Sequence, residues 1–292
     1  MEQQTYEKRG YLREDFRLFH LSGAMDEPVD WHYHTFHKII LFLSGRAAYG
    51  IEGKSYPLES GDLIVVPSGC IHRPELAPGA PYERVIVYIS PEFLRAAGAP
   101  GCDLESCFTQ ARMQFRFVLR PGAGRRSFTA ALSALEQEQG GQHFGSELMA
   151  RALFLQFLIG VSRGMAENRL EYVSSSACDE KIVAILQYLS LHLTEELRID
   201  DLAARFYISK YHMMRRFRQE TGYSVHGYLT EKRLLLARQL LGQGCTPAEA
   251  AAQAGYQDYS TFSRAYKKQF GHGPSADTKG KQQDLQITTQ EF

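Results

Sequence analysis

The residues best suited to chemistry in the N-terminal third of the chain are three histidines. His32 and His34 are two positions apart, so on a strand their imidazoles point to the same face. His72 ends a second segment, residues 61–72, and can bring a third imidazole from a neighbouring strand. Three imidazole nitrogens can hold a metal ion, but histidines can equally fill the interior of a small β domain. The pattern allows both interpretations, and His37 is a further imidazole that could take part.

A second feature with chemical potential is a block of residues that occurs twice near the C-terminus. Residues 213–222 align without a gap on residues 262–271, an offset of 262 − 213 = 49. Both blocks read apolar, variable, Arg, variable, aromatic, basic, then three more residues and Gly, and they place Arg215 and Arg264 at equivalent positions. The register extends upstream, where Ser209 aligns with Asp258. A constant offset of this kind indicates a repeated supersecondary unit.

Charge separates the repeat from the rest of the chain. The whole sequence has 33 Lys and Arg against 33 Asp and Glu. Residues 198–272 contain 12 basic and 6 acidic residues, a net of 12 − 6 = +6. The remainder has 33 − 12 = 21 basic and 33 − 6 = 27 acidic residues, a net of −6. A basic module joined to an acidic partner predicts a polyanion as the ligand of the module alone.

Length and composition limit the class of protein. A chain of 292 residues with 44% hydrophobic and 23% charged residues is typical of two globular domains, each with its own core. The first residues lack the apolar segment of a secretory signal, and the most apolar stretch, residues 152–161, is too short to span a bilayer. The five cysteines form no CxxC pair, as expected in a reducing compartment. We therefore predict a cytoplasmic protein without a membrane partner.

The histidines lie among short β-branched and aromatic runs that are separated by turn residues. The runs predict strands at residues 38–43, 46–51, 54–58, 62–66 and 84–89. Their spacing is typical of a small antiparallel barrel or sandwich, and we expect a compact β-barrel. No nucleotide-binding fingerprint accompanies it.

Helices are predicted after these strands, at residues 91–98, 127–139 and 146–165, with a strand-like segment at 113–119. The longest of them has two apolar stripes, one through Leu148 and Leu155 and one through Phe154 and Met165. Because both stripes need cover, we expect this helix to pack on the barrel and on a second copy of the chain, which gives a homodimer. The alternative is that both faces pack within one subunit.

The repeat belongs to a segment that reads as helical throughout. The predicted helices cover residues 178–193, 201–206, 210–220, 224–241, 247–254 and 259–270. Asp200, Ser209 and Asp258 are expected to cap helix starts, and Thr246 with Glu249 has the pattern of a capping box. Two short capped helices joined by a few residues form a helix-turn-helix unit. The sequence therefore predicts two such units, joined by a long helix.

Residues 182–274 resemble the DNA-binding domain of the AraC/XylS family of bacterial transcription regulators. The resemblance rests on Leu202, Ala203, Ser209, Arg215, Phe217, Gly222, Tyr228, Leu229, Arg233, Leu234, Ala237, Leu240, Leu241, Ala251, Ala252, Gly255, Tyr256, Phe262, Arg264, Tyr266, Lys267, Lys268, Gly271 and Pro274. The family implies an N-terminal cupin-like sensor and dimerisation domain before two helix-turn-helix units. An aromatic–Arg pair usually follows the Pro in this family, but residues 275–278 lack it, which leaves the end of the last helix open.

This resemblance implies a multidomain α+β chain, with a cupin-like antiparallel β-barrel and flanking helices before an all-α domain. We assign residues 1–168 to the sensing and dimerisation domain and residues 169–177, with three consecutive serines, to a linker. Residues 178–278 form the double helix-turn-helix domain, and residues 279–292 form a polar tail.

The two histidine segments resemble the two motifs of the cupin superfamily, His-x-His followed by Gly and Gly-x5-Pro-x-Gly-x2-His. Metal-binding cupins complete the site with a Glu four residues after the second His, where this chain has Lys38. Because an ammonium opposes a bound cation, we predict no metal and no other cofactor. The resemblance implies instead a pocket for a small-molecule effector such as a sugar. We expect it to be lined by His32, His34, Tyr49, His72 and Arg73.

Two recognition helices on one rigid connector can enter successive major grooves, about 34 Å apart, on one face of a duplex. In this interpretation the base contacts come from Tyr211, Arg215, Ser260, Ser263 and Arg264. The contacts to the DNA backbone come from Ser209, Lys210, Arg218, Lys267 and Lys268. Because the two faces differ, we expect two unlike half-sites and an asymmetric operator.

The sequence therefore predicts a sequence-specific DNA-binding transcription regulator, not an enzyme, controlled by a small molecule in the N-terminal domain. Its predicted partners are double-stranded DNA, an effector, a second copy of the chain and, in an activator, RNA polymerase. One alternative is a metal-dependent cupin enzyme fused to a DNA-binding domain, which requires a metal on the three histidines. Another is a regulator without a ligand, whose barrel serves only for dimerisation.

Overall fold

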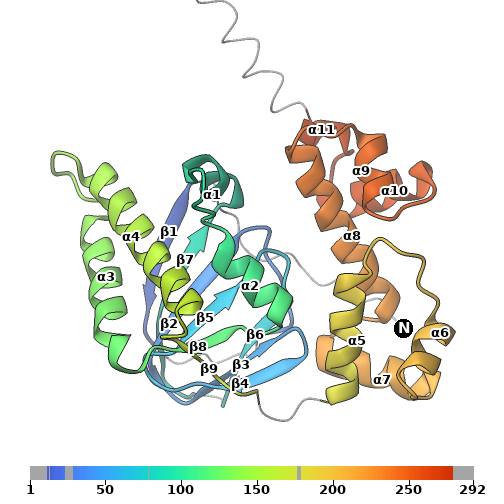
Figure 1. Ribbon diagram of the computed structural model, residues 1–292, viewed down its shortest axis with the longest axis horizontal. Coiled ribbons are helices and arrows are strands. Elements are labelled where there is room, and N and C mark those ends of the chain that lie inside the picture. The colour runs from blue at the N-terminus through green and yellow to red at the C-terminus, as the bar shows by residue number, and fades with distance from the viewer. Residues whose placement is uncertain (1–11, 13, 24–28, 78, 176–178, 279–292) are drawn as a thin grey trace, which may run out of the picture. The chain divides into compact units, whose positions relative to one another are not determined.

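The computed structural model describes residues 12, 14–23, 29–77, 79–175 and 179–278 (Figure 1). The chain divides into two compact units, Met1–Cys178 and Asp179–Phe292. The predicted polar tail, residues 279–292, lies outside the described residues, as do residues 176 and 177 of the predicted linker.

Two antiparallel sheets form the centre of the first unit. The larger sheet has the strand order β1-β7-β2-β5-β8-β9, and the smaller has the order β4-β3-β6. The strands are β1 (Phe16–Leu21), β2 (His37–Gly45), β3 (Ala47–Ile51), β4 (Lys54–Pro57), β5 (Leu63–Val66), β6 (His72–Leu76), β7 (Tyr82–Ile89), β8 (Val118–Arg120) and β9 (Glu171–Tyr172). The predicted antiparallel cupin-like fold is confirmed.

The barrel, however, is not closed. Among the described residues β1 and β9 are the outer strands of the larger sheet, and β4 and β6 are those of the smaller one. The chain changes sheets after Gly45, which has φ 124° and lies so close to Pro81 that a Cβ would overlap the Pro81 carbonyl oxygen. Strand β3 then pairs with β4 and β6, so the larger sheet does not curl round on itself.

The five strands predicted between residues 38 and 89 are all present with ends within two residues of the prediction, but three further strands, β1, β6 and β9, were not predicted. One of these is β6, which contains Pro74 at the edge of its sheet, where the missing N–H is tolerated. Another is β9, which pairs Tyr172 with Leu119 inside the segment predicted as a linker. The predicted strand at 113–119 was partly wrong, because α2 extends to Gln114 and only residues from Val118 onward form a strand.

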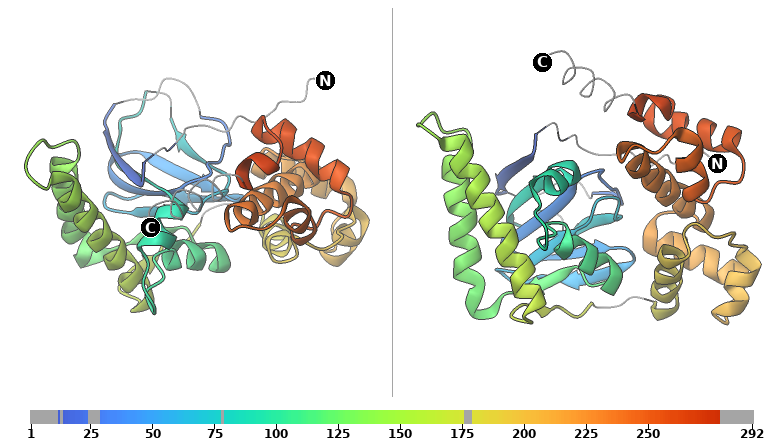
Figure 2. Two further views of the ribbon diagram at one scale, coloured as in Figure 1. Left: turned by 90° about the horizontal axis from the view of Figure 1, so that it is seen from above. Right: turned by 45° about the horizontal axis from the view of Figure 1, so that its top comes forward.

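Four helices, α1 (Pro91–Ala97), α2 (Ser106–Gln114), α3 (Arg125–Glu138) and α4 (Ser146–Ala166), flank the sheets. Figure 2 shows α3 and α4 side by side along one flank of the sheets. The stripe of α4 through Phe154 and Met165 is buried, and Phe154 stacks on Phe16 of β1 with ring centroids 4.4 Å apart. The other stripe faces outward, with Leu148 73% exposed. By length and apolar composition α4 could also cross a bilayer, a property that long helices of folded domains share.

The second unit is entirely helical in its described part. Its helices are α5 (Glu180–Leu191), α6 (Ile199–Arg205), α7 (Lys210–Thr221), α8 (Val225–Gly242), α9 (Pro247–Gln253), α10 (Tyr259–Phe270) and α11 (Ser275–Thr278). In Figure 1, α5, α6 and α7 gather at one end of α8, and α9, α10 and α11 gather at the other. The two predicted helix-turn-helix units are α6–α7 and α9–α10.

Capping residues determine where most of these helices begin. Ser209 accepts a hydrogen bond from the His212 N–H at 3.3 Å, and Asp258 accepts one from the Thr261 N–H at 2.6 Å. The predicted capping box at Thr246 is also present. The predicted cap at Asp200 was wrong, because α6 begins at Ile199. Asp200 lies in the first turn instead, where its charge favours the helix dipole.

Candidate nucleic-acid interface and histidine cluster

The inner faces of α7 and α10 bury equivalent residues of the repeat. Met213 and Phe217 of α7 are fully buried, and so are Phe262 and Tyr266 of α10. These positions are 49 residues apart in each pair (262 − 213 and 266 − 217). Because the same register positions point inward in both helices, the outward faces are also equivalent.

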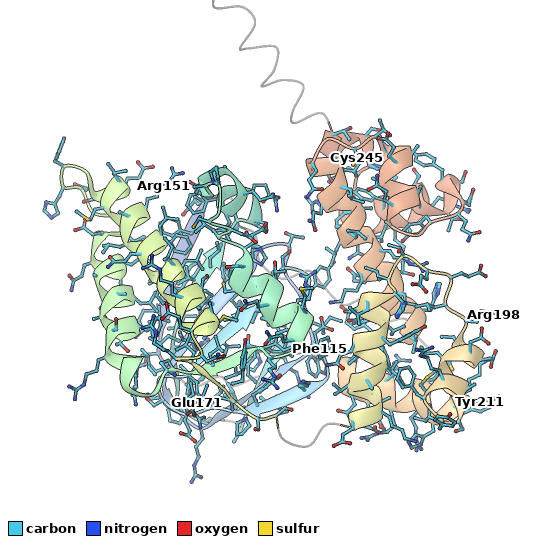
Figure 3. All side chains as sticks on the ribbon, viewed as in Figure 1. Phe115, Arg151, Glu171, Arg198, Tyr211 and Cys245 are labelled. Atoms are coloured by element: carbon cyan, nitrogen blue, oxygen red, sulfur yellow. The ribbon has the colours of Figure 1, made fainter. Side chains whose placement is uncertain are left out.

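The outward face of α7 combines large side chains with positive charge. Tyr211 is 87% exposed and projects from the surface of the unit (Figure 3). Met214 is 44% exposed, and Arg215 and Arg218 are exposed on the same face. Lys210, at the start of the helix, forms an exposed ion pair with Asp200 at 2.8 Å.

The outward face of α10 is smaller and carries hydroxyl groups. Ser260, Arg264, Lys267 and Lys268 are exposed, and Ser263 is half-buried. The Arg264 Nε–H donates to the Ser260 carbonyl oxygen at 3.3 Å, which keeps the start of the side chain along its own helix. The hydrogen bond from Thr261 to Asp258 lowers the pKa of that carboxyl, so the cap is charged at neutral pH.

An aspartate that was not predicted from the sequence holds α11 against the rest of the second unit. Asp277 of α11 accepts a hydrogen bond from the Tyr266 hydroxyl and lies 3.4 Å from Arg238 Nε of α8. Burial and the neighbouring Asp277 raise the pKa of Tyr266, so its hydroxyl remains a donor. A partly buried aspartate thus holds α11 to α10 and α8, in a segment that lacks the aromatic–Arg pair. No sequence pattern specific to position 277 indicated this contact.

The three predicted histidines do come together in the first unit. His32, His34 and His72 are buried, and one ring nitrogen of each lies within 4.8 Å of those of the other two. Backbone pairing holds two of them together, because the His32 N–H donates to the His72 carbonyl at 3.1 Å and the His72 N–H donates to the His32 carbonyl at 2.9 Å. His37 takes no part. Its Nε2 contacts Glu105 at 3.1 Å and its Nδ1 accepts from the Ser68 N–H.

Lys38 reaches into this histidine cluster. His72 Nδ1 lies 2.9 Å from the Cys70 carbonyl oxygen and therefore carries the proton, which leaves Nε2 as an acceptor. Lys38 Nζ lies 3.2 Å from that Nε2. Burial, with a smaller effect of Arg84, lowers the pKa of Lys38 to about 7. Burial and then Lys38 hold the pKa of His72 well below its ordinary value. A lysine amine thus occupies one of the three nitrogens that a metal ion would need.

Two other residues were predicted to line the same pocket. The Tyr49 ring stacks on His72 with centroids 6.0 Å apart, so it belongs to the cluster. Arg73 follows His72 on β6 and points to the opposite face, where its guanidinium lies 4.5 Å from the Trp31 ring. Arg73 also pairs with Glu75 at 3.4 Å. The structure therefore brings together four of the five predicted pocket residues and separates Arg73 from them.

Comparisons with known proteins match one domain within each of the two units. Residues 18–158 match the AraC-like ligand binding domain, and residues 202–279 match a helix-turn-helix domain. The chain is 25% identical over 266 residues to the HTH-type transcriptional activator RhaS of Escherichia fergusonii, covering 90% of this chain and 91% of the relative. It is 24% identical over 263 residues to RhaS of Escherichia coli O6:H1, covering 87% and 89%.

Solved structures are also similar. One is the DNA-binding domain of AdpA in complex with a target DNA, with 28% identity and a TM-score of 0.33 over 34% of this chain and 91% of that one. Another is ToxT from Vibrio cholerae O395, with 17% identity and a TM-score of 0.35 over 90% and 96%.

The matched domains span most of both units, and the curated relatives span nearly the whole chain. The relatives are transcription regulators, and the alternative of a cupin enzyme with a fused DNA-binding domain gains no support from them. The chain therefore belongs to the AraC/XylS family of DNA-binding transcription regulators, with a ligand-binding unit followed by a double helix-turn-helix unit.

Proposed function

We propose that this regulator reads an asymmetric operator with one recognition helix in each of two successive major grooves. The observation that carries the proposal is the equivalence of α7 and α10, which bury the same register positions and turn an arginine outward at the same place. Arg215 and Arg264 then contact base edges, since a bidentate arginine is the commonest reader of guanine. Tyr211, Ser260 and Ser263 contact bases beside them.

The DNA backbone is contacted by the remaining polar residues of the two helix faces. These are Ser209, Lys210, Arg218, Lys267 and Lys268. Lys210 reaches a phosphate by exchanging its exposed partner Asp200, a pair that is worth little in water. Fluorescence anisotropy with a selected operator, between about 50 and 200 mM salt, tests the proposal, because phosphate contacts release counterions. We expect affinity to fall steeply as salt rises, whereas a flat response would contradict any role in DNA binding.

The first unit is proposed to bind a small-molecule effector, such as a sugar, beside the histidine cluster. The proposal is supported by the position of His32, His34, Tyr49 and His72, which lie together, whereas Arg73 points to the opposite face of β6. An effector that binds two arrangements of the chain with unequal affinity shifts the equilibrium between them and so changes the affinity for DNA; DNA changes the affinity for the effector by the same factor. A thermal-shift screen of sugars and metabolites against the full chain tests this. A regulator whose first unit only dimerises would show no shift with any compound.

Dimerisation is proposed to use the outward stripe of α4. Leu148 is largely exposed, and Leu155 and Ile159 continue the stripe with half-buried side chains. Leu155→Glu should give a monomer in light scattering, and Gln156→Glu, at an exposed position of the same helix, should not. A dimeric Leu155→Glu variant would exclude this face.

The proposed setting follows from these functions. The regulator acts in the cytoplasm, where its DNA lies, and contacts RNA polymerase if it activates transcription. We propose a sensing domain over residues 1–168 and a DNA-binding domain over 178–278, with residues 169–177 between them. The pairing of β9 with β8 ties the first part of that linker to the sensing domain.

A further inference from the structure

The two recognition helices differ in a systematic way at equivalent positions. Tyr211 and Met214 of α7 correspond to Ser260 and Ser263 of α10, since 260 − 211 and 263 − 214 both equal 49. In each helix the two positions are three residues apart, so their side chains are neighbours on the outward face. One helix therefore presents two large, partly apolar groups where the other presents two hydroxyls.

Packing within the unit does not account for the large groups on α7. Tyr211 is 87% exposed and makes no hydrogen bond or ring contact with any residue that the structure describes. Met214 is 44% exposed, while Met213, the residue before it, is fully buried and supplies the core contact of this turn. Tyr211 and Met214 are neighbours on this face, and adjacent exposed apolar groups are typical of a binding surface, unlike single ones.

The charges beside these residues identify what covers them. Arg215 and Arg218 lie on the same face of α7, and no acidic residue lies among residues 210–219. A basic face suits a polyanion, and in the major groove of DNA the C5-methyl of thymine is the apolar group among hydrogen-bonding base edges. An apolar protein partner would leave the two arginines facing apolar surface, which is costly.

We propose, on the basis of the DNA-binding function proposed above, that Met214 and Tyr211 read thymine C5-methyl groups in the half-site of the first helix-turn-helix unit. The half-site of the second helix-turn-helix unit is then read through the hydroxyls of Ser260 and Ser263 and through Arg264, without dependence on a methyl group. The operator thus contains a half-site that requires thymine methyls and one that does not.

The test replaces each thymine of a selected operator, one at a time, by deoxyuridine, which lacks only the C5-methyl. Affinity of the full chain is measured by fluorescence anisotropy. We expect a loss of about threefold to fivefold at one or two thymines of the first half-site, because burial of one methyl group has about that worth. Thymines of the second half-site should show no loss.

Variants assign the effect to the side chains. Met214→Ser introduces the residue type found at the equivalent position of α10. With this variant the loss of affinity on uridine substitution should disappear at the thymine that Met214 contacts. Tyr211→Ser should do the same at its neighbour. Met214→Leu, which keeps an apolar side chain, should retain the loss, and so should Arg215→Ala. Because residues 211 and 214 are exposed, unchanged thermal melting serves as the folding control.

Each outcome has a distinct meaning. Specific DNA binding without any effect of uridine in the first half-site, or a first half-site without thymine, overturns this inference and leaves the proposed function standing. An effect of uridine that persists in both serine variants also overturns it. Absence of sequence-specific binding by the full chain contradicts the proposed function itself.

Discussion

Replacement of Lys38 should change the stability of the first unit in a way that depends on pH. Lys38 is 5% exposed, and burial lowers the pKa of its amine to about 7, against 10.5 for the ordinary side chain. Between these values the unfolded chain binds a proton that the folded chain does not bind. The free energy of unfolding therefore rises with pH across this window, and below pH 7 the folded unit must hold a buried ammonium.

The size of the effect follows from the width of the window. One proton of difference changes the free energy of unfolding by about 1.4 kcal/mol per pH unit, or by about 4 kcal/mol between pH 7 and pH 10. Lys38→Met removes this dependence. It also removes the donor 3.2 Å from His72 Nε2, a loss worth about 1 kcal/mol. We therefore expect the variant to be more stable than the original chain by roughly 3 kcal/mol at pH 7, with the advantage gone by pH 10.

Urea unfolding of the full chain at pH 7, 8, 9 and 10 measures this difference. Trp31 is the single tryptophan and is buried in the first unit, so its fluorescence follows that unit alone. Lys38→Arg is the control, because a guanidinium stays charged throughout and should be destabilising at every pH. An original chain that gains no stability relative to Lys38→Met between pH 7 and pH 10 would contradict a lowered pKa of Lys38 in the folded unit.

Two further predictions concern the second unit, with far-UV circular dichroism during urea unfolding as the measurement. Asp277→Ala should lower the free energy of unfolding by roughly 1–3 kcal/mol, because the Tyr266 hydroxyl loses its acceptor, and an unchanged midpoint would contradict the role of that contact. Gly255→Ala should lower the free energy of unfolding by at least about 1–3 kcal/mol, because φ is 85° and a Cβ would lie 2.7 Å from the Thr194 carbonyl oxygen. Gly242→Ala, in open space at the end of α8, is the matched control and should not destabilise.

The second unit was largely predictable because its signals are local. Helical periodicity and side-chain caps act within one or two turns, so Ser209, Thr246 and Asp258 marked helix starts correctly. The cap at Asp200 was predicted wrongly because an aspartate is favourable both at the N-cap and in the first turn of a helix. Its ion pair with Lys210 of α7 is a contact between two helices, which the local pattern does not indicate.

The first unit was less predictable because its pairing is non-local. Runs of β-branched residues located strands, but nothing in them indicated which strands share a sheet, and so the change of sheet after Gly45 was missed. Short or proline-containing strands such as β9 and β6 give too weak a pattern. The histidine cluster was predicted from the period of two and the second motif, whereas the contact between Lys38 and His72 depends on the pairing of strands far apart in sequence.

Helices α7 and α10 are proposed to read two separate stretches of one operator. Hydroxyl-radical footprinting of the full chain on a selected operator should show two protected patches about 10 bp apart. Arg215→Ala should relax base preference in one patch only and Arg264→Ala in the other only, each by roughly 1–3 kcal/mol. A single contiguous patch that is weakened in the same way by either substitution would contradict the account.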